Sequence, residues 1–321
     1  MIPVAVDKKV FELCGTPTVS SEVERLYGQL QQVCALDDEQ LDQLHYDWEA
    51  AFAELIRKSR KSSGERRAMI AAAYDGLIVI LKERRRRQGK VLDCMGFCPG
   101  QVEEICTVAG QPPRSVLDVG CSTGVLVASL LQRGYAATGI DVSGDCIAEA
   151  RNRLEALGAD AEGNLLCGDF LAHDFGEARF DLIYSNDVLE HIPPDEVLDF
   201  LKKAHSLLNP SGLLWLITPN RWTGPGDATI LRHPWGTEAR GLHLKEHTLR
   251  ELNQALQSCG FVEVHSRLWS DGRWRKGTRP RRVYNGLKVL LEPALARFSA
   301  GVRRRIMIIM RYAEVLAVRN S

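Results

Sequence analysis

Apolar and polar residues follow two different patterns along the chain. Residues 36–60 and 65–88 place apolar side chains at helical spacing and are rich in helix-favouring residues, which predicts two helices. From residue 115 onward, short apolar segments alternate with amphipathic ones such as 144–156 and 195–208, which are predicted to be helices. The apolar segments predict strands at 115–119, 136–140, 164–167, 181–185 and 212–218. This alternation predicts an α/β fold whose parallel sheet is covered by helices on both faces.

Two domains are expected from this pattern. Residues 1–110 form a helical extension that ends near the turn-forming GQPP sequence at 110–113, and residues 111–321 form the α/β domain. Residues 261–269 and 312–320 alternate between apolar and polar positions and are predicted to be two further strands. A long basic insert, 270–311, separates these two strands and has a helical pattern.

Composition places the chain among ordinary globular proteins. Its 41 basic and 41 acidic residues balance, and 45% of its residues are hydrophobic. No apolar run is long enough to predict a transmembrane helix, and the N-terminus is a poor signal peptide. The nine cysteines are scattered, and Cys94 and Cys98 have no companion pair, so reduced thiols in a cytoplasmic protein are expected.

Charge is distributed unevenly along the chain despite this balance. Residues 267–321 contain 14 Lys or Arg against three acidic residues, a net charge of +11, so the preceding residues sum to −11. Another basic run, KERRRRQGK at 82–90, lies within that acidic portion. Such runs usually lie on solvated surfaces, but they also meet phosphates or anionic lipids.

A glycine-rich turn follows the first predicted strand. Residues 116–124 have the sequence VLDVGCSTG, in which Asp118 lies near the end of an apolar run and Gly120 and Gly124 frame the turn. A parallel strand that leads through such a turn into a helix exposes backbone N–H groups to a ligand at the carboxyl edge of the sheet. The spacing differs from the GxGxxG of dinucleotide-binding dehydrogenases.

Three later segments place polar residues at the same edge. Asp141 in GIDVS ends the next strand about 20 residues further on, where a carboxylate can accept both hydroxyls of a ribose. Asp169 in GDF follows the third strand, within reach of an exocyclic amine. The segment FDLIYSNDVLEHIPP at 180–194 ends the fourth strand in a polar cluster.

With these four ordered motifs, residues 114–266 resemble the class I S-adenosylmethionine-dependent methyltransferases, in particular the group that includes the ubiquinone-type O-methyltransferases. The resemblance implies a Rossmann-like, mostly parallel sheet of seven strands that closes with an antiparallel hairpin. It also implies S-adenosyl-L-methionine as cofactor. The residues implied to contact it are Asp118, Gly120, Cys121, Ser122, Gly124, Asp141, Val142, Asp169, Phe170, Asn186 and Asp187.

The resemblance gives several of these residues a role. The turn would meet the methionine moiety, with Asp118 or the nearby backbone at its ammonium group, while Asp141 would hold the ribose. Asp169 and Phe170 would flank the adenine, and Asn186 and Asp187 would lie beside the methionine and the acceptor. Structural roles are open as well: Asp118 as a cap of the loop, Asp141 as the N-cap of the helix at 144–156, and Phe170 as a core residue.

Methylation of an oxygen requires removal of its proton, which a base with a near-neutral pKa accomplishes best. His191, directly after Glu190, is the first candidate, although it also suits a purely organising role in the loop. His243 and His247, in HLKEH at 243–247, are the other candidates, and their segment would border the acceptor pocket. No metal site is expected from this histidine pair, because the next helix begins at Thr248, after both of them.

Methyl transfer to a small-molecule, lipid-linked or sugar-linked acceptor, most readily on oxygen, is therefore the expected function. An RNA or other nucleic-acid methyltransferase is the alternative that the basic insert permits, although Ser185-Asn186-Asp187 replaces an NPPY-type base-flipping motif. A non-catalytic cofactor-binding partner protein is the other alternative. The insert at 270–311 is expected either to cover the core with its arginines outward or to dock at a membrane or a phosphorylated acceptor.

Overall fold

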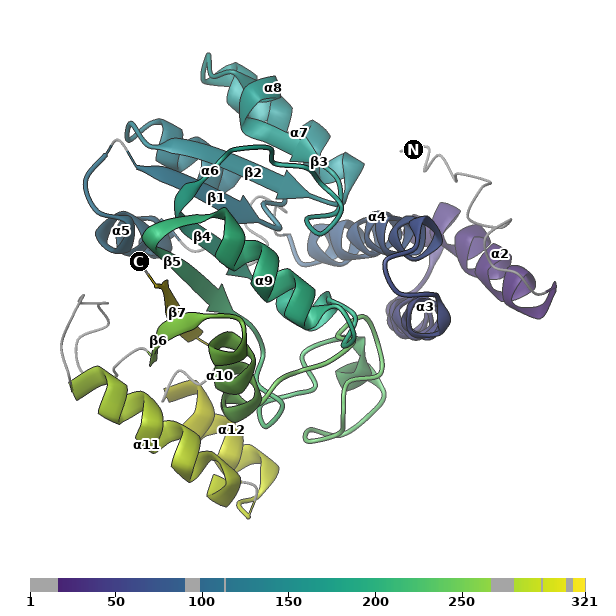
Figure 1. The fold of residues 1–321 in the computed structure, drawn as a ribbon. Coiled ribbons are helices and arrows are strands. Elements are labelled where there is room, and N and C mark those ends of the chain that lie inside the picture. The colour runs from purple at the N-terminus through teal and green to yellow at the C-terminus, as the bar shows by residue number, and fades with distance from the viewer. Residues whose placement is uncertain are drawn as a thin grey trace.

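A seven-stranded sheet forms the centre of the molecule (Figure 1). The computed structural model describes residues 17–89, 99–112, 114–266, 280–295, 297–309 and 314–320. The strands lie in the order β3-β2-β1-β4-β5-β7-β6. Their bounds are β1 Ser115–Val119, β2 Ala136–Asp141, β3 Leu165–Cys167, β4 Phe180–Asn186, β5 Leu208–Ile217, β6 Phe261–Ser266 and β7 Glu314–Arg319.

Strand direction follows the predicted pattern. β1 to β5 run parallel, whereas β7 is antiparallel to both β5 and β6. In register, Asp118 lies beside Gly139 of β2 and Tyr184 of β4, so the ends of the central strands meet at one edge of the sheet. The expected mostly parallel sheet with an antiparallel terminal hairpin is confirmed. Residues 267–269 and 312–313 of the two predicted terminal strands lie outside the described residues.

Helices pack on both faces of the sheet, as the alternation predicts. One face carries α6 (Val125–Leu131), α7 (Gly144–Ala156) and α5 (Pro99–Ala109). The other face carries α9 (Val197–Leu207), α10 (Leu249–Ser258) and α11 (Pro280–Leu295). α5 shares the hydrophobic cluster of the sheet through Ile105 and Val108, although the sequence groups it with the N-terminal extension. The short helix α8 (Ala161–Asn164) takes up Asn164, the first residue of the predicted third strand, and leads into β3.

The N-terminal helices form a separate hydrophobic cluster beside the sheet. They are α2 (Pro17–Gln31), α3 (Asp38–Lys58) and α4 (Gly64–Arg87), and the short 3-10 helix η1 (Val33–Ala35) joins the first two. Asp37 begins α3 with a capping box to Gln40, and Ser63 caps α4, which explains why both helices begin where they do. Gly76 allows α4 to pack closely on Trp48 of α3, because a Cβ atom there would lie 1.9 Å from the indole.

Figure 1 shows α3 and α4 beyond the ends of β1 and β2, so this extension faces the carboxyl edge of the sheet. The long segment between β5 and α10 lies between α3 and α10. It contains the 3-10 helix η3 (Ala228–Leu231), and its Leu242 and Leu244 join the cluster of the N-terminal helices. Cys94 and Cys98 lie outside the described residues.

The insert contains α11 and α12 (Ala300–Ile309). The expected outward arginines are present at Arg304 and Arg305 of α12, but α11 is different: its Leu287, Leu290 and Leu291 are exposed, whereas Lys288 is buried. The arginines of α11, Arg281 and Arg282, lie outside the residues whose side chains are described, so the predicted cover with arginines outward stays a prediction for this helix. No helix among the described residues is long and apolar enough to cross a bilayer.

Candidate active site

A cavity of about 640 Å³ lies between the carboxyl edge of the sheet and α4. Its size is typical of a site for a small ligand. Eight residues that the sequence predicts as cofactor contacts line it: Gly120, Ser122, Asp141, Val142, Asp169, Phe170, Asn186 and Asp187. His191 and His243 line it as well, so the structure brings most of the predicted site residues together.

The turn after β1 has the backbone shape that a close ligand contact needs. Gly120, Ser122 and Gly124 have φ values of 79°, 48° and 71°. A Cβ atom on Gly120 would lie 2.3 Å from Val188 Cγ2, and the N–H groups of Gly120 and Cys121 both donate to Ile140 O. Glycine is therefore required at 120 by both its backbone conformation and its surroundings.

Asp141 links the turn to the beginning of α7. Its Oδ2 accepts a hydrogen bond from the Ser122 N–H at 2.8 Å, and its Oδ1 accepts one from the Ser143 N–H at 2.9 Å. Ser143, whose Oγ accepts from the Cys146 N–H, is the N-cap of α7. The alternative in which Asp141 caps this helix is therefore wrong, and its carboxylate is held at the wall of the cavity by two backbone amides.

Asp169 and Phe170 lie between α4 and the sheet. Oδ1 of Asp169 pairs with Arg67 of α4 at 2.6 Å and also accepts the Leu171 N–H. The Phe170 ring is 6% exposed and packs on Phe200 at 4.9 Å between ring centroids. Phe170 is thus a core residue that also lines the cavity, so the structural and the binding role predicted for it are compatible.

Four predicted residues do not line the cavity. Cys121 and Gly124 pack inside the turn: Cys121 is buried among the helices, and Gly124 lies against Ala150. His247 pairs through its backbone with Asn220, and burial lowers the pKa of its side chain to about 4. Asp118 is buried below the turn, where burial, together with the nearby Asp141 charge, raises its pKa to about 8.

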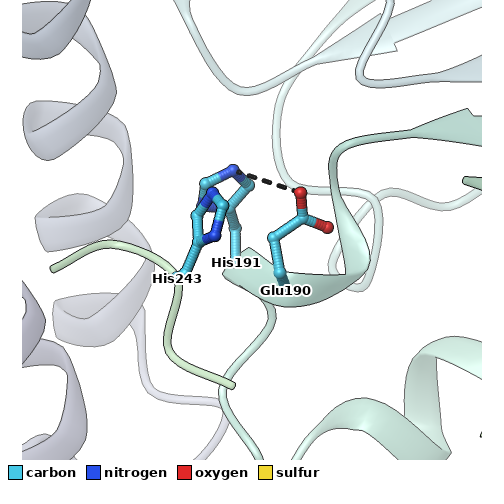
Figure 2. Close-up of side chains that lie close together, drawn as sticks. All are labelled: Glu190, His191 and His243. Carbon is cyan, nitrogen blue, oxygen red and sulfur yellow. Dashed lines mark ion pairs between the residues drawn. The ribbon is translucent and has the colours of Figure 1, made fainter. Parts of the chain in front are cut away.

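Two histidines and a glutamate meet at the wall of the cavity (Figure 2). Glu190 and His191 belong to the 3-10 helix η2 (Leu189–His191), which directly follows β4, while His243 comes from the segment before α10. The two imidazole rings lie 4.8 Å apart at 79°, and His191 Nε2 lies 3.9 Å from Glu190 Oε1. Residues far apart in the sequence thus form one cluster.

Hydrogen bonds fix the orientation of each member of this cluster. His191 Nδ1 bonds Leu242 O at 2.8 Å, which requires the proton on Nδ1 and leaves the lone pair on Nε2. His243 Nδ1 bonds Glu246 Oε1 at 2.8 Å, and Glu190 Oε2 accepts from Thr218 Oγ1 at 2.9 Å. Glu190 Oε1 is buried without a hydrogen-bond partner among the described residues.

The two histidines carry different charges. Burial lowers the pKa of His191 to about 3, with the charge of His243 contributing, so His191 is a neutral imidazole. Burial also disfavours the cation of His243, but its hydrogen bond with Glu246 and the charges of Glu190 and Asp227 outweigh this and raise its pKa to about 9. Burial raises the pKa of Glu190 to about 8.

These three side chains also have the donor set of a metal site. One donor atom of each lies within 4.8 Å of the others, and both Nδ1 atoms already have backbone or carboxylate partners. A carboxylate and two imidazoles suit a divalent transition metal ion, and such outer partners are typical of histidine ligands. In the sequence His243 pairs most readily with His247, because nothing in the spacing places His243 beside Glu190.

The N-terminal helices α3 and α4 contribute side chains to this site that the sequence did not single out. Glu49 of α3 bonds His45 Nε2 at 2.9 Å and accepts the N–H groups of Ala228 and Leu242. Tyr74 of α4 packs edge-on against His191, with 5.3 Å between ring centroids. The helical spacing of residues 65–88 could have indicated this contribution, since it places Ile70, Tyr74 and Leu77 on one face of α4.

A family model described as a methyltransferase domain matches residues 84–266, more than half of the 321 residues. The chain belongs to this methyltransferase family. Membership confirms the predicted class I S-adenosylmethionine-dependent family, its enzyme class and its cofactor.

Curated relatives of this methyltransferase resemble only part of it. The ubiquinone biosynthesis O-methyltransferase of Pseudomonas paraeruginosa is 32% identical over 123 residues, which are 38% of this chain and 52% of the relative. The protein of the same name from Coxiella burnetii is 33% identical over 120 residues, or 37% and 48% of the two chains. The chain therefore spans about half the length of the curated relatives it matches.

Solved structures resemble the methyltransferase only distantly. A TehB-like S-adenosylmethionine-dependent methyltransferase from Corynebacterium glutamicum matches with a TM-score of 0.45 and 16% identity. The match covers 78% of this chain and 99% of that one. A likeness at this level does not bear on activity or acceptor.

The cavity of the methyltransferase fits its cofactor. S-adenosylmethionine carries positive charge at its sulfonium and ammonium groups, and Asp141, Asp169 and Asp187 all line the cavity. Asp118, whose carboxyl has a raised pKa, lies just below the turn, where a cation would stabilise its ionised form. The left-handed turn at Gly120 and Ser122 lines the same cavity beside these carboxylates.

Proposed function

We propose that this methyltransferase transfers a methyl group from S-adenosylmethionine to an oxygen of a small, largely apolar acceptor. The observation that carries this proposal is the division of one cavity into two different walls. The sheet edge supplies carboxylates and glycine, whereas α4 supplies Ile70, Leu77, Ile78 and Leu81. His191 and His243 also line this cavity.

The cofactor would occupy the sheet side of the cavity. The turn from Gly120 to Ser122 would lie against its methionine, with Asp118 below the ammonium group. Asp141 would accept the ribose hydroxyls, and Asp169 and Phe170 would flank the adenine. Asn186 and Asp187, at the end of β4, would then lie nearest the transferable methyl group, which the sulfonium makes reactive.

The acceptor would occupy the side of the cavity formed by α4. Four apolar residues of this helix face the cavity, joined by Ile230 and Leu231 of the η3 region. Arg84 and Arg85 line the cavity at the end of α4, which suits an acceptor with an anionic substituent. An acceptor with an apolar body, one hydroxyl group and one acidic or phosphate group would match the apolar residues, the histidines and the arginines that line the cavity.

His191 is the best-positioned base in this arrangement, and the negative charge that develops on the acceptor oxygen would raise its pKa from the low value of the free protein. Its Nδ1–H donates to Leu242 O, so its Nε2 is free to accept the proton of the acceptor hydroxyl. His243, held by Glu246, would donate to the same oxygen and stabilise its negative charge. His247 lies away from the cavity, so it has no part in this proposal.

The printed names of the curated relatives support oxygen as the acceptor atom, since both are O-methyltransferases. A screen with S-adenosylmethionine labelled in its methyl group tests the proposal. We expect label in phenols, quinols or hydroxylated lipids and methyl ethers as products. Label transfer confined to RNA, or to nitrogen, would contradict it.

Two half-buried residues of α4 provide a matched test of the acceptor wall. Leu81 lines the cavity and Val79 does not, although both pack against the cluster of the N-terminal helices. Leu81→Ser is expected to raise KM for an apolar acceptor about tenfold, because it removes apolar contact area. Val79→Ser should leave KM unchanged, and equal effects of the two variants would argue against acceptor binding at this wall.

Replacement of the proposed base separates chemistry from cofactor binding. His191→Ala is expected to lower kcat by about 10² to 10⁴ without changing the Kd of S-adenosylhomocysteine. His247→Ala, outside the cavity, serves as the matched control and should retain kcat. Full activity of His191→Ala would exclude His191 as the base.

A further inference from the structure

In the part of α11 whose side chains are described, residues 286–295, three leucines are exposed and both charged side chains are buried. Leu287, Leu290 and Leu291 are 47%, 69% and 45% exposed, whereas Lys288 and Glu292 are each 1% exposed. A helix on the surface of a globular protein normally has the opposite arrangement. Between residues 286 and 295 every exposed side chain is apolar, so the exposed face of this described part of α11 carries no charged group.

Specific polar contacts hold α11 in this orientation. The Glu292 carboxylate accepts the N–H groups of Leu249 and Arg250 at 2.7 and 2.9 Å, at the beginning of α10. It also accepts Asn220 Nδ2 at 2.9 Å. Rotating α11 to bury its leucines would break all three bonds and leave the first turn of α10 without these acceptors. The outward leucines are therefore a fixed feature of the fold.

The apolar surface continues into the next helix. Phe298, in the turn after α11, is 48% exposed, and Val302 of α12 is 47% exposed. Of the nine large apolar side chains that are exposed in the described parts of the chain, five lie between residues 287 and 302. Such clustering is typical of a surface that contacts something apolar.

Basic side chains border these apolar ones. Arg297, Arg304 and Arg305 are exposed, and the Arg304 guanidinium lies 4.1 Å from the ring centroid of Trp235, which is 42% exposed. Residues 267–321 carry a net charge of +11, while the preceding residues sum to −11. Charge is therefore distributed unevenly along the sequence, although its net charge is zero, and the exposed arginines among the described residues of this basic portion lie close to the apolar side chains.

We propose that this surface, Leu287, Leu290, Leu291, Phe298 and Val302 with the neighbouring arginines, docks on an anionic lipid bilayer. Apolar side chains would enter the headgroup boundary while the arginines meet anionic lipids. A second copy of the chain is a poorer partner. A two-fold contact through the same surface would bring like-charged arginines together.

The docking surface lies next to the segment that forms part of the active site. Arg303 Nε donates to Trp222 O at 3.0 Å, and Trp222 and Trp235 belong to the segment between β5 and α10 that carries Asp227 and His243. Resting on the proposed function, this proximity would let a bilayer-dissolved acceptor reach the cavity. Docking itself does not depend on methyl transfer.

Co-sedimentation of the full chain with lipid vesicles tests the proposal. We expect binding to vesicles of phosphatidylcholine with 30 mol% phosphatidylglycerol, weak binding to phosphatidylcholine alone, and release as salt rises from about 0.05 to 0.5 M. L290S/L291S should weaken binding at least tenfold. L157S/L198S is the matched control, because Leu157 and Leu198 are each 44% exposed elsewhere and should not matter.

Charge is tested in the same assay. R297Q/R305Q should weaken binding about tenfold or more, whereas R60Q/K202Q removes two exposed charges elsewhere and should have no effect. Absence of binding to anionic vesicles, or equal losses in test and control variants, would overturn the proposal. So would light scattering that shows a dimer which L290S/L291S dissociates. Because vesicle binding is measured without any acceptor, failure of methyl transfer would leave this result standing.

Discussion

Asp118 lies below the glycine-rich turn after β1, and we expect its protonation to depend on whether the cofactor is bound above that turn. Burial and the Asp141 charge raise its pKa to about 8, so its carboxyl is mostly protonated at pH 6.5 in the free protein. The proposed binding of the cofactor's ammonium group above Asp118 would stabilise the carboxylate, so binding would release a proton below pH 8. The affinity for S-adenosylhomocysteine is therefore expected to rise by up to about tenfold per pH unit between pH 6 and 8.

Calorimetric titrations across this pH range check the prediction. Asp118→Asn cannot ionise, so its affinity should be lower and nearly constant with pH. An unchanged slope in Asp118→Asn would show that another group takes up the proton.

Gly120 has little freedom to accept a side chain. Its φ of 79° is unfavourable for alanine, and a Cβ atom would clash with Val188 Cγ2 at 2.3 Å. Gly120→Ala is expected to lower the free energy of unfolding by about 1–3 kcal/mol. Gly144→Ala, at a helical position with open space around it, should change the free energy by less than 1 kcal/mol or stabilise. Urea unfolding of both variants checks this difference.

The position of an individual cavity residue could be predicted where a short local motif determines it. Asp141 and Asn186 end β2 and β4, and Asp169 follows the end of β3 by two residues, so the parallel order of the strands predicts that all three lie at one edge of the sheet. The pairing of His191 with His243 was not predictable, because it depends on how a long irregular segment folds back over the sheet. Likewise, no pattern in the sequence indicates that Glu190 Oε1 is buried without a hydrogen-bond partner.

At the level of elements, a buried arginine joins α4 to the sheet domain. Arg66 is 3% exposed and bonds Asp195 and Glu196, just before α9, at 2.8 and 3.0 Å. Arg66→Ala would leave the buried Glu196 without its cation. We expect a loss of about 3–5 kcal/mol in the free energy of unfolding.

Denaturant unfolding of single and double variants tests this pair. Arg66→Ala combined with Glu196→Gln should lose less than the sum of the two single losses, because both remove the same interaction. If the double variant loses the full sum of the two single losses, the Arg66–Glu196 interaction contributes nothing to the free energy of unfolding.

Most elements were predictable from periodicity. The helix at 144–156 and the strand at 115–119 have the predicted bounds, and the two N-terminal helices differ only at their ends. The orientation of α11 was not predictable, because a hydrophobic pattern shows that a helix has two faces and not which one is buried. The hydrogen bonds between Glu292 and α10 determine the orientation of α11. They join segments about 40 residues apart, so the local sequence pattern does not reveal them.

At the scale of the whole molecule, the N-terminal helices and the sheet share the cavity and several polar contacts. Asp75 of α4 accepts Ser143 Oγ at 2.8 Å, Arg67 pairs with Asp169, and Lys82 pairs with Glu149. Helices 38–87 and the sheet are therefore expected to unfold in one transition. S-adenosylhomocysteine at 100 times its Kd should stabilise that transition by about 2.7 kcal/mol.

Trp48 lies in the cluster of the N-terminal helices and Trp215 lies in the sheet. Thermal unfolding of Trp48→Phe and Trp215→Phe, each followed by the fluorescence of the remaining tryptophans and by circular dichroism, compares the two regions. Separate midpoints, only one of which moves with ligand, would indicate that the helices do not belong to the binding unit.

The central claim is that the carboxyl edge of the sheet binds the sulfonium cofactor. Calorimetric titration of S-adenosylhomocysteine into the wild-type protein and into Asp141→Asn, with circular dichroism to confirm folding, tests it most directly. We predict one site per chain and an affinity at least 30-fold weaker in the variant, since the amide replaces one carboxylate acceptor by a donor and removes the negative charge. No binding by the folded wild-type protein, or equal binding by both proteins, would contradict the account.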